Sequence, residues 1–385
     1  MRFPEEVPRL GDGRVLLRAH RLDDVDAITE QCQSEEMQRW TLVPTPYSRE
    51  DAVAYVRSRP AGWADESQCA FAIEAPQGTG PTRFAGSVSL NVASPGIGAV
   101  GFGLHPLARG HGVMTAAVRL VADWALEKML IQRLTWSSIV GNLASWRVVW
   151  RNGFSFEGSL RCAQPQRGNL LDSWNASLLS TDARDPKTRW LAHPVLRGDR
   201  VVLRPMHSGD ESRYLEAVHD VETHRWLHEI PFARDRETFQ RRVLAVGLAP
   251  SLGQALEWAV ADPATDDYLA GINLFGFDSL DHNSAEVGYR THPAARGQGV
   301  MREAMSVLLG QAFRPEADGG YGLDRVSLDA GDGNIGSQAV ARTSGFVETG
   351  RDRACYLRSD GRVVDLLRFD LLADEWRSMH QLPLS

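Results

Sequence analysis

Hydrophobic and polar positions follow two different periodicities along the chain, one typical of strands and one typical of helices. The points at which one periodicity gives way to the other predict the order of the elements. Short apolar or alternating runs bounded by polar residues predict strands, whereas apolar residues at steps of three and four predict helices. In the first half, strands are expected at 15–18, 68–75, 83–92, 98–105 and 133–140, helices at 22–32, 48–58 and 114–129, a further helix opening at Asn142, and two closing strands ending at Ser180. Ser48 is the expected N-cap of the second helix. This order predicts an α+β fold around a mixed sheet.

The same order of elements recurs in the second half of the chain. The stretch HPLARGHGVMTAAV, which begins at His105, returns as HPAARGQGVMREAM at His292, and GNLASWRVVWRNGF at Gly141 returns as GNIGSQAVARTSGF at Gly333. A self-similarity this long indicates a duplicated domain. The polar, Pro-containing stretch between the copies predicts a linker, so we expect domains at 1–185 and 195–385 joined by 186–194.

Composition narrows the classes of protein that the chain can belong to. It has 385 residues, a formal net charge of −7 and no run of eighteen apolar residues, and its first ten residues lack the apolar segment of a secretory signal. We therefore expect a cytoplasmic protein with neither a membrane nor nucleic acid as its partner. Four isolated cysteines, Cys32, Cys69, Cys162 and Cys355, fit neither a disulfide framework nor a metal site, so no metal is expected.

The repeated glycine loop is the strongest chemical signal. In each copy a predicted strand ends at His-Pro and is followed by Arg-Gly-x-Gly and a predicted helix. The first N–H groups of a helix lack intrahelical acceptors and lie at the positive end of its dipole, so this place suits an anion such as a pyrophosphate. An ordinary glycine-containing turn is the alternative. Neither the Rossmann fingerprint nor the P-loop pattern is present.

These loops resemble the coenzyme A loop, R/Q-x-x-G-x-G/A, of the GNAT superfamily of acyl-CoA N-acyltransferases, in particular its RimJ/RimL-like branch. The resemblance implies two tandem GNAT domains, each a mixed, mostly antiparallel twisted sheet flanked by helices, with acetyl-CoA as the cofactor. It assigns cofactor binding to the two loops and to the main chain of the preceding strands, namely Arg109, Gly110, His111, Gly112, Val113 and Met114 with Phe102, Gly103 and Leu104, and Arg296, Gly297, Gln298, Gly299, Val300 and Met301 with Tyr289, Arg290 and Thr291. Both loops depart from the family pattern in ending on Met.

A second motif of the family bears on catalysis. Many members carry an Asn at the start of a later helix and, seven residues on, a Tyr that protonates the departing thiolate; here the Tyr positions hold Val149 and Ala341. The related pattern N-x-x-S offers a hydroxyl instead, and it is present as Asn142 with Ser145 and as Asn334 with Ser337. Helix capping is the equally weighted alternative for these residues.

The resemblance implies transfer of acetyl to a primary amine of a peptide or protein N-terminus, a small metabolite or an antibiotic. Glu286 is the candidate base, and its counterpart in the first half is Ala99. We therefore expect the second half to be catalytic and the first to be a scaffold, with Trp146, Trp150 and Trp174 narrowing the first acceptor space or burying an interface. Four residues are expected to contact the acceptor: Trp40, Trp226, His228 and Glu229.

Two other classes of protein stay open at this point. One is a non-catalytic acyl-CoA-binding protein or sensor, which the missing tyrosines would allow. The other is a nucleotide-dependent enzyme that uses the glycine loop for NAD or ATP. The duplication itself predicts a pseudo-dimer within a single, monomeric chain.

Overall fold

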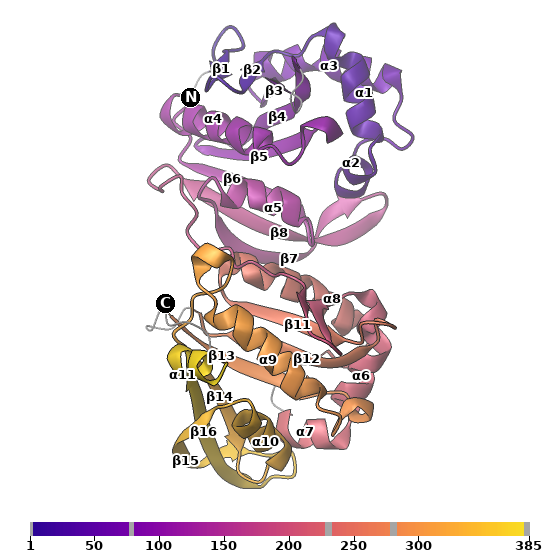
Figure 1. Cartoon of the computed structure of the whole chain (residues 1–385). Helices are drawn as coiled ribbons and strands as arrows, with labels where there is room; N and C mark the ends of the chain where they lie inside the picture. The colour runs from indigo at the N-terminus through magenta and orange to yellow at the C-terminus, as the bar shows by residue number, and fades with distance from the viewer. Residues whose placement is uncertain (1–2, 77–80, 228–232, 278–282, 381–385) are drawn as a thin grey trace. The chain divides into compact units, whose positions relative to one another are not determined.

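The computed structural model describes residues 3–76, 81–227, 233–277 and 283–380, and its contacts divide the chain into two compact units, Met1–Lys187 and Thr188–Ser385. Each unit contains its own eight-stranded sheet flanked by helices (Figure 1). The α+β class and the duplicated architecture predicted from the sequence are thereby confirmed.

The elements of the first unit follow the predicted order closely. They are β1 (Leu10–Gly11), β2 (Leu16–Arg18), α1 (Val25–Gln33), α2 (Glu35–Trp40), α3 (Arg49–Ala64), β3 (Gln68–Pro76), β4 (Thr82–Ser94), β5 (Ile97–Leu104), α4 (Val113–Glu127), β6 (Arg133–Ile139), α5 (Leu143–Trp150), β7 (Ser155–Gln166) and β8 (Asn169–Leu179). The side chain of Ser48 accepts a hydrogen bond from the N–H of Asp51, which confirms Ser48 as the N-cap of α3. The short helix α2 was not predicted, because its six residues carry no apolar period.

The second unit repeats these elements and adds a helix at its end. They are β9 (Leu196–Arg197), β10 (Val202–Pro205), α6 (Glu211–His219), α7 (Val221–Leu227), α8 (Arg236–Leu248), β11 (Ala255–Ala261), β12 (Tyr268–Phe275), β13 (Ser284–Thr291), α9 (Val300–Phe313), β14 (Arg325–Gly331), α10 (Ile335–Thr343), β15 (Val347–Leu357), β16 (Val363–Leu372) and α11 (Ala373–Met379). Part of the expected linker packs on this unit, because Leu191 is buried and its N–H donates to the carbonyl of Pro250.

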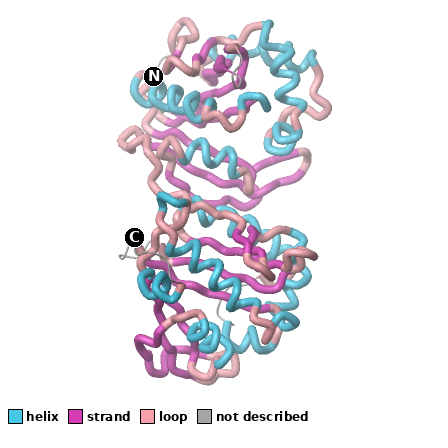
Figure 2. Tube along the Cα trace, viewed as in Figure 1, coloured by secondary structure: helices cyan, strands magenta, loops and turns pink. Residues whose placement is uncertain are grey.

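The strand order places one parallel pair in the middle of each sheet. The orders are β1-β2-β3-β4-β5-β6-β8-β7 and β15-β16-β14-β13-β12-β11-β10-β9, and all described pairs are antiparallel except β5 with β6 and β13 with β14. Figure 2 shows helices and strands alternating through both units. In Figure 1, α4 and α5 lie next to each other across the first sheet, as α9 and α10 do across the second.

In each sheet the two parallel strands pair with each other over only three residues and then diverge. In the first unit, β5 pairs with β6 only from Ile97 to Ala99, although β5 itself continues to Leu104 alongside β4. In the second unit, β13 pairs with β14 only from Ser284 to Glu286 and continues to Thr291 alongside β12. Among the described residues, the later half of each strand therefore has a strand neighbour on one side only, and its other edge is open.

The three tryptophans that were expected to obstruct the first unit do not line its cavity. Trp146 and Trp174 are almost fully buried and pack around Phe156 in the core, with ring centroids 5.5 and 6.3 Å away. Trp150 is absent from the cavity wall as well. The obstruction predicted for the first unit is therefore wrong, since two of the rings are core residues.

Candidate active site

The glycine loops have the left-handed backbone that only glycine adopts without strain. The φ angles are +80° at Gly110, +73° at Gly112, +71° at Gly297 and +78° at Gly299. Gly112 and Gly299 are the N-cap residues of α4 and α9. A Cβ placed at Gly110 or Gly297 would meet no described atom within 4 Å, so the space in front of each loop is open. Each loop thus presents helix N–H groups to free space, as an anion site requires.

The loop arginines turn away from that space toward a neighbouring helix. Arg109 donates to Glu36 at 2.8 Å and to the hydroxyl of Ser34 at 3.0 Å, both at the start of α2. Arg296 likewise bonds Asp220 and the hydroxyl of Thr223 at the start of α7. These side chains tie the early helices to the loop, a role that the spacing of the motif did not reveal.

A different arginine accompanies each loop, and the sequence analysis assigned it no role. Arg14 donates to the carbonyl of His111, and Arg200 donates to the carbonyl of Gln298 at 3.2 Å. Both stand at the same place in the repeated stretches GRVLLR and DRVVLR. An arginine at the same place before a repeated strand was the sequence signal that could have identified these two residues. Arg14 and Arg200 thus bring a second positive charge to each glycine loop, beside that of the loop arginine.

In the N-x-x-S motif the Asn side chain caps the helix by accepting from the backbone N–H of the Ser, which leaves the serine hydroxyl to other partners. The side-chain oxygen of Asn142 accepts from the N–H of Ser145 at 3.1 Å, and that of Asn334 accepts from the N–H of Ser337 at 3.2 Å. The indole N–H of Trp136 donates to the Ser145 hydroxyl at 3.0 Å. In the second unit the corresponding partner is the Tyr289 hydroxyl, 2.9 Å from the Ser337 hydroxyl. Burial raises the pKa of Tyr289 to about 12.

Glu286 lies among charged side chains on the second sheet. Its strand pairs it with Ser327 of β14, and Ala99 occupies the matching place in the first sheet. Burial and the Asp329 carboxylate raise the pKa of Glu286, and the Arg368 guanidinium partly offsets them. Arg368 is itself bonded to Asp329 and Asp352. A raised pKa suits a general base, and the catalytic role of Glu286 stays a prediction.

The acceptor segments differ between the two units. Trp40 lines a cavity in the first unit, whereas Trp226 is buried, stacks on Tyr356 at 6.4 Å and lies against Gly331. His228 and Glu229, which were also expected to contact the acceptor, lie outside the described residues.

The cavity of the first unit has a volume of about 950 Å³. Its wall includes residues of α1, α2 and α3 on one side and of the sheet on the other, and it contains Asn142, Ser145 and the β5 residues Phe102 and Gly103. The first unit therefore brings the open strand edge, the N-x-x-S motif and an enclosed space together. Such a concave space next to convergent polar groups is the expected form of a ligand site.

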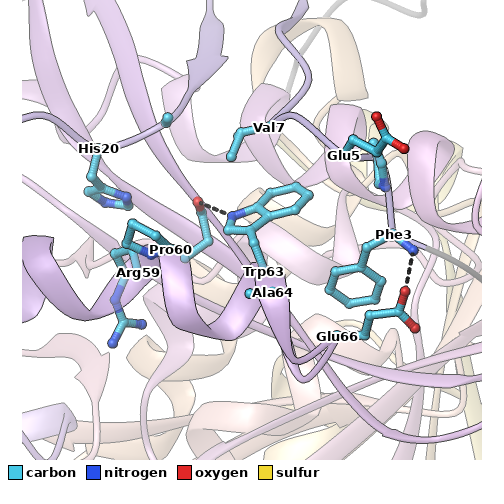
Figure 3. Close-up of a pocket in the computed structure, with 12 residues that line it drawn as sticks. Phe3, Glu5, Val7, His20, Arg59, Pro60, Trp63, Ala64 and Glu66 are labelled. Carbon is cyan, nitrogen blue, oxygen red and sulfur yellow. Dashed lines mark hydrogen bonds between the residues drawn. The ribbon is translucent and has the colours of Figure 1, made fainter.

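A smaller cavity of about 360 Å³ lies on the N-terminal side of the same unit (Figure 3). Trp63 stands between His20 and Phe3 in its wall, and the indole N–H of Trp63 donates to the carbonyl of Ala70 at 3.4 Å. The Nε2 of His20 lies 3.0 Å from the hydroxyl of Ser87, a residue that lines the larger cavity, whereas His20 itself lines only the smaller one. Burial lowers the pKa of His20 to about 4, so this imidazole is neutral at physiological pH.

The fold, the glycine loop that suits an anion and the open strand edge beside it define one type of α+β domain, which is present twice in the chain. A model of the acetyltransferase (GNAT) domain matches residues 14–155 and 200–347. The chain therefore belongs to the GNAT acetyltransferase domain family, as the sequence resemblance implied, and both of its units carry the domain.

Several known proteins are similar to parts of the chain. "Putative ribosomal N-acetyltransferase YdaF" of Bacillus subtilis (strain 168) is 34% identical over 112 residues, which is 29% of this chain and 57% of that protein. "Probable N-acetyltransferase YjcK" of the same organism is 39% identical over 62 residues, 16% of this chain and 34% of that protein. The matches therefore span less than two thirds of either relative.

Solved structures with a similar fold include RimJ of Mycobacterium smegmatis in complex with CoA-disulfide, with 18% identity, a TM-score of 0.41, and coverage of 46% of this chain and 90% of that chain. RimL, a ribosomal L7/L12 alpha-N-protein acetyltransferase in complex with coenzyme A, has 20% identity, a TM-score of 0.40, and coverage of 45% and 98%.

Two further searches of the described residues concern membranes and metals. No helix among them is both long and apolar enough to cross a bilayer. Within the same residues, no group of three His, Cys, Asp or Glu side chains has a geometry that could hold a metal ion. Of the four cysteines, Cys32 and Cys69 are buried, and burial raises the pKa of Cys32 to about 11.

Proposed function

We propose that the chain is an acetyl-CoA-dependent N-acetyltransferase that passes an acetyl group directly to a primary amine. The observation that carries the proposal is the convergence, in a domain of the GNAT family, of the glycine loop, the open edge of β5 and the Ser145 hydroxyl. The glycine loop would hold the pyrophosphate of the cofactor, and the open edge would pair with its pantetheine arm.

The chemistry assigned to this arrangement is a single displacement. The neutral amine nitrogen attacks the thioester carbonyl, a C–N bond forms, the C–S bond breaks, and coenzyme A leaves as a thiolate that takes up a proton. Bound acetyl-CoA supplies the activated carbonyl, and the protein holds the amine beside it. Ser145 is a candidate proton donor, because the Trp136 N–H occupies an acceptor position of its oxygen and leaves its O–H for another partner.

The acceptor is proposed to be an amine of a peptide or protein N-terminus, a small metabolite or an antibiotic. The name of the similar YdaF describes a ribosomal N-acetyltransferase, which favours a protein N-terminus within this set.

Isothermal titration with acetyl-CoA, NAD and ATP tests the cofactor. We expect micromolar or tighter binding of acetyl-CoA, weaker binding of the other two, and loss of acetyl-CoA binding in the double variant Gly112→Trp with Gly299→Trp. Gly361→Trp is the matched control, because Gly361 has a φ of +79°, faces open space and lies in a distant turn. Unchanged acetyl-CoA affinity in the double variant would reduce the loop to an ordinary turn.

Catalysis needs a separate readout. Mass spectrometry of candidate peptides, polyamines and amino sugars incubated with acetyl-CoA should reveal a mass increase of one acetyl group on one of these classes. Tight acetyl-CoA binding without transfer to any amine would favour the non-catalytic acyl-CoA-binding protein.

A further inference from the structure

The wall of the large cavity in the first unit contains almost no charge. Among the described residues that line it, Asp51 is the only charged side chain, and its carboxylate already bonds the N–H and hydroxyl of Ser48. No Arg, Lys or His of the described lining faces this space. A phosphate or carboxylate group would therefore find no positive side chain to replace its water of hydration.

Hydroxyl, amide and aromatic groups are instead spaced among aliphatic side chains along this wall. Four serines of the sheet, Ser87, Ser89, Ser137 and Ser138, contribute hydroxyls, and Trp40 and Trp136 contribute rings. Hydroxyls and amides match a ligand with several uncharged hydrogen-bonding groups, and flat rings match its C–H surfaces. This combination suits a polyhydroxylated body better than a purely apolar one.

Gln31 contributes a buried hydrogen-bond acceptor without a donor to the cavity wall. Its side chain is 4% exposed, it lines the cavity, and its Oε1 has no hydrogen-bond partner among the described residues. A buried carbonyl oxygen without a donor costs free energy, which a donor arriving with a ligand would recover. An amine or hydroxyl group supplies such a donor.

The second unit fills the corresponding space with its own side chains. The sheet register matches Gly103, in the wall of the large cavity, to Arg290, and Ala70, in the wall of the smaller cavity, to Glu257. Both Arg290 and Glu257 are buried. Glu257 accepts from Arg242 of α8 at 2.5 Å and from Arg290 at 3.4 Å, while the Arg290 guanidinium lies over the Tyr214 ring at 4.4 Å.

The residue of the second unit that matches Gln31 is Ala217, which is fully buried in the core between α6, α8 and the sheet. Among the described residues of the second unit, packed side chains thus stand at the places that match Gln31 and Gly103 of the cavity wall. The presence of Glu286 on that sheet does not by itself provide room for an acceptor.

We propose that the first unit binds the acceptor, and that the acceptor is a small amine with an uncharged, hydroxyl-rich body, as in an amino sugar, which donates a hydrogen bond to Gln31. This inference rests on the acetyltransferase function proposed above and narrows its substrate class. It replaces the sequence-based expectation that the second half takes the acceptor. In the transfer, the neutral amine nitrogen forms the new C–N bond, the C–S bond breaks, and the one proton that the nitrogen loses ends on the coenzyme A sulfur, so that the amide product keeps the other N–H.

A pair of substrates tests the chemistry of the wall. With the full-length protein and acetyl-CoA, glucosamine should be acetylated, and glucosamine 6-phosphate should react with a kcat/KM at least about a hundredfold lower, because its phosphate meets no cation in the cavity. Equal rates for the two sugars would overturn the proposal. Acetylation of a peptide N-terminus but of neither sugar would overturn it too, while leaving the proposed function standing. Absence of acetyl-CoA binding would remove the proposed function itself.

Substitutions of Gln31 test its role as a positioning residue. Gln31→Met keeps the volume and removes the acceptor, so KM for glucosamine should rise about tenfold with kcat and the KM for acetyl-CoA nearly unchanged. Gln31→Glu keeps an acceptor oxygen and should hold the KM for glucosamine within about threefold of the native value. Gln132→Ala, at an exposed amide of the same unit, is the control.

The pattern across these variants separates binding from folding. If Gln31→Met and Gln31→Glu change KM equally, or if Gln31→Met lowers only the melting temperature, Gln31 is a structural residue and the proposal fails. The proposal is supported if the KM for glucosamine stays near the native value in Gln31→Glu, which keeps the acceptor oxygen, and rises in Gln31→Met, which lacks it.

Discussion

At the scale of single residues, the structural and chemical roles of the serine in the N-x-x-S motif belong to different groups: its backbone N–H donates the cap bond of the helix, and its hydroxyl is the candidate proton donor. The cap bond of α5 uses the backbone N–H of Ser145, so it survives any substitution except proline. Ser145→Ala should therefore leave the melting temperature and acetyl-CoA affinity nearly unchanged while lowering kcat by roughly 10²-fold, because the proton donor is lost. Steady-state kinetics with Ser145→Thr as the hydroxyl-keeping control checks this; an unchanged kcat in Ser145→Ala would exclude the hydroxyl from proton transfer.

Glu286 makes a second residue-level prediction, about stability and pH. Its pKa is raised in the folded protein by burial and by Asp329, so the native state binds a proton more tightly than the unfolded chain does. Stability should then fall as the pH rises from the unfolded value near 4 through the higher folded value. Glu286→Gln removes that loss, so the variant should melt above the native protein at pH 7.5 and close to it at pH 4 in scanning calorimetry. A Glu286→Gln protein that melts lower at pH 7.5 would show that the ionised carboxylate is net stabilising.

At the scale of elements, a buried ion pair joins the second strand to the first helix in each unit. Arg18 of β2 forms a bidentate ion pair with Asp24, with hydrogen bonds of 2.7 and 2.8 Å. Arg204 of β10 forms the same kind of pair with Asp210, at 2.7 and 2.9 Å. Replacing Arg18 by Met leaves the Asp24 carboxylate buried without its partner, which should cost about 3–5 kcal/mol. Urea unfolding of the Arg18→Met variant measures this, and a loss below about 1 kcal/mol would contradict the assigned role.

The elements also show where sequence reasoning succeeded and where it could not. Helices and strands of the first unit were predicted because period and capping are local properties, as at Ser48. The parting of β5 from β6 after Ala99 was not, because register between strands depends on partners distant in the sequence. The glycine loops were predicted as anion sites, yet the partners of Arg109 on α2 and the position of Arg14 beside His111 depend on how elements approach in space.

At the scale of the whole molecule, the duplication predicts two cofactor sites. Both loops share the same left-handed glycines, helix start and accompanying arginine. Titration should therefore give about two acetyl-CoA molecules per chain, and one in either Gly112→Trp or Gly299→Trp, because each variant closes a single loop. A native stoichiometry of one, lost in only one of these variants, would mean that the other loop has no cofactor.

The two units also show why a single candidate residue, Glu286, does not by itself decide which half takes the acceptor. In the sequence, Glu286 favoured the second half as the catalytic one. A sequence shows that a carboxylate is present, but it does not show whether there is room for an acceptor beside it. Space depends on pairs such as Gly103 and Arg290, which stand at matching places on the two sheets. The Met37 and Gln31 side chains lie against Gly103, whereas Arg290 buries its own side chain in the second unit. A glycine in a strand carries little weight in a sequence, although here its lack of a side chain lets Met37 and Gln31 lie against the strand.

The parted strands have one more consequence, which concerns handling of the protein. The edge of β5 from Val100 to Leu104 is an unfinished ladder in the middle of a sheet, and an unfinished ladder attracts the backbone of other chains. A coenzyme arm lying along it would act as a removable ninth strand that shields the edge. We therefore expect slower hydrogen–deuterium exchange of these amides and less precipitation on storage when coenzyme A is present, so that the cofactor also serves the chain as a solubility agent.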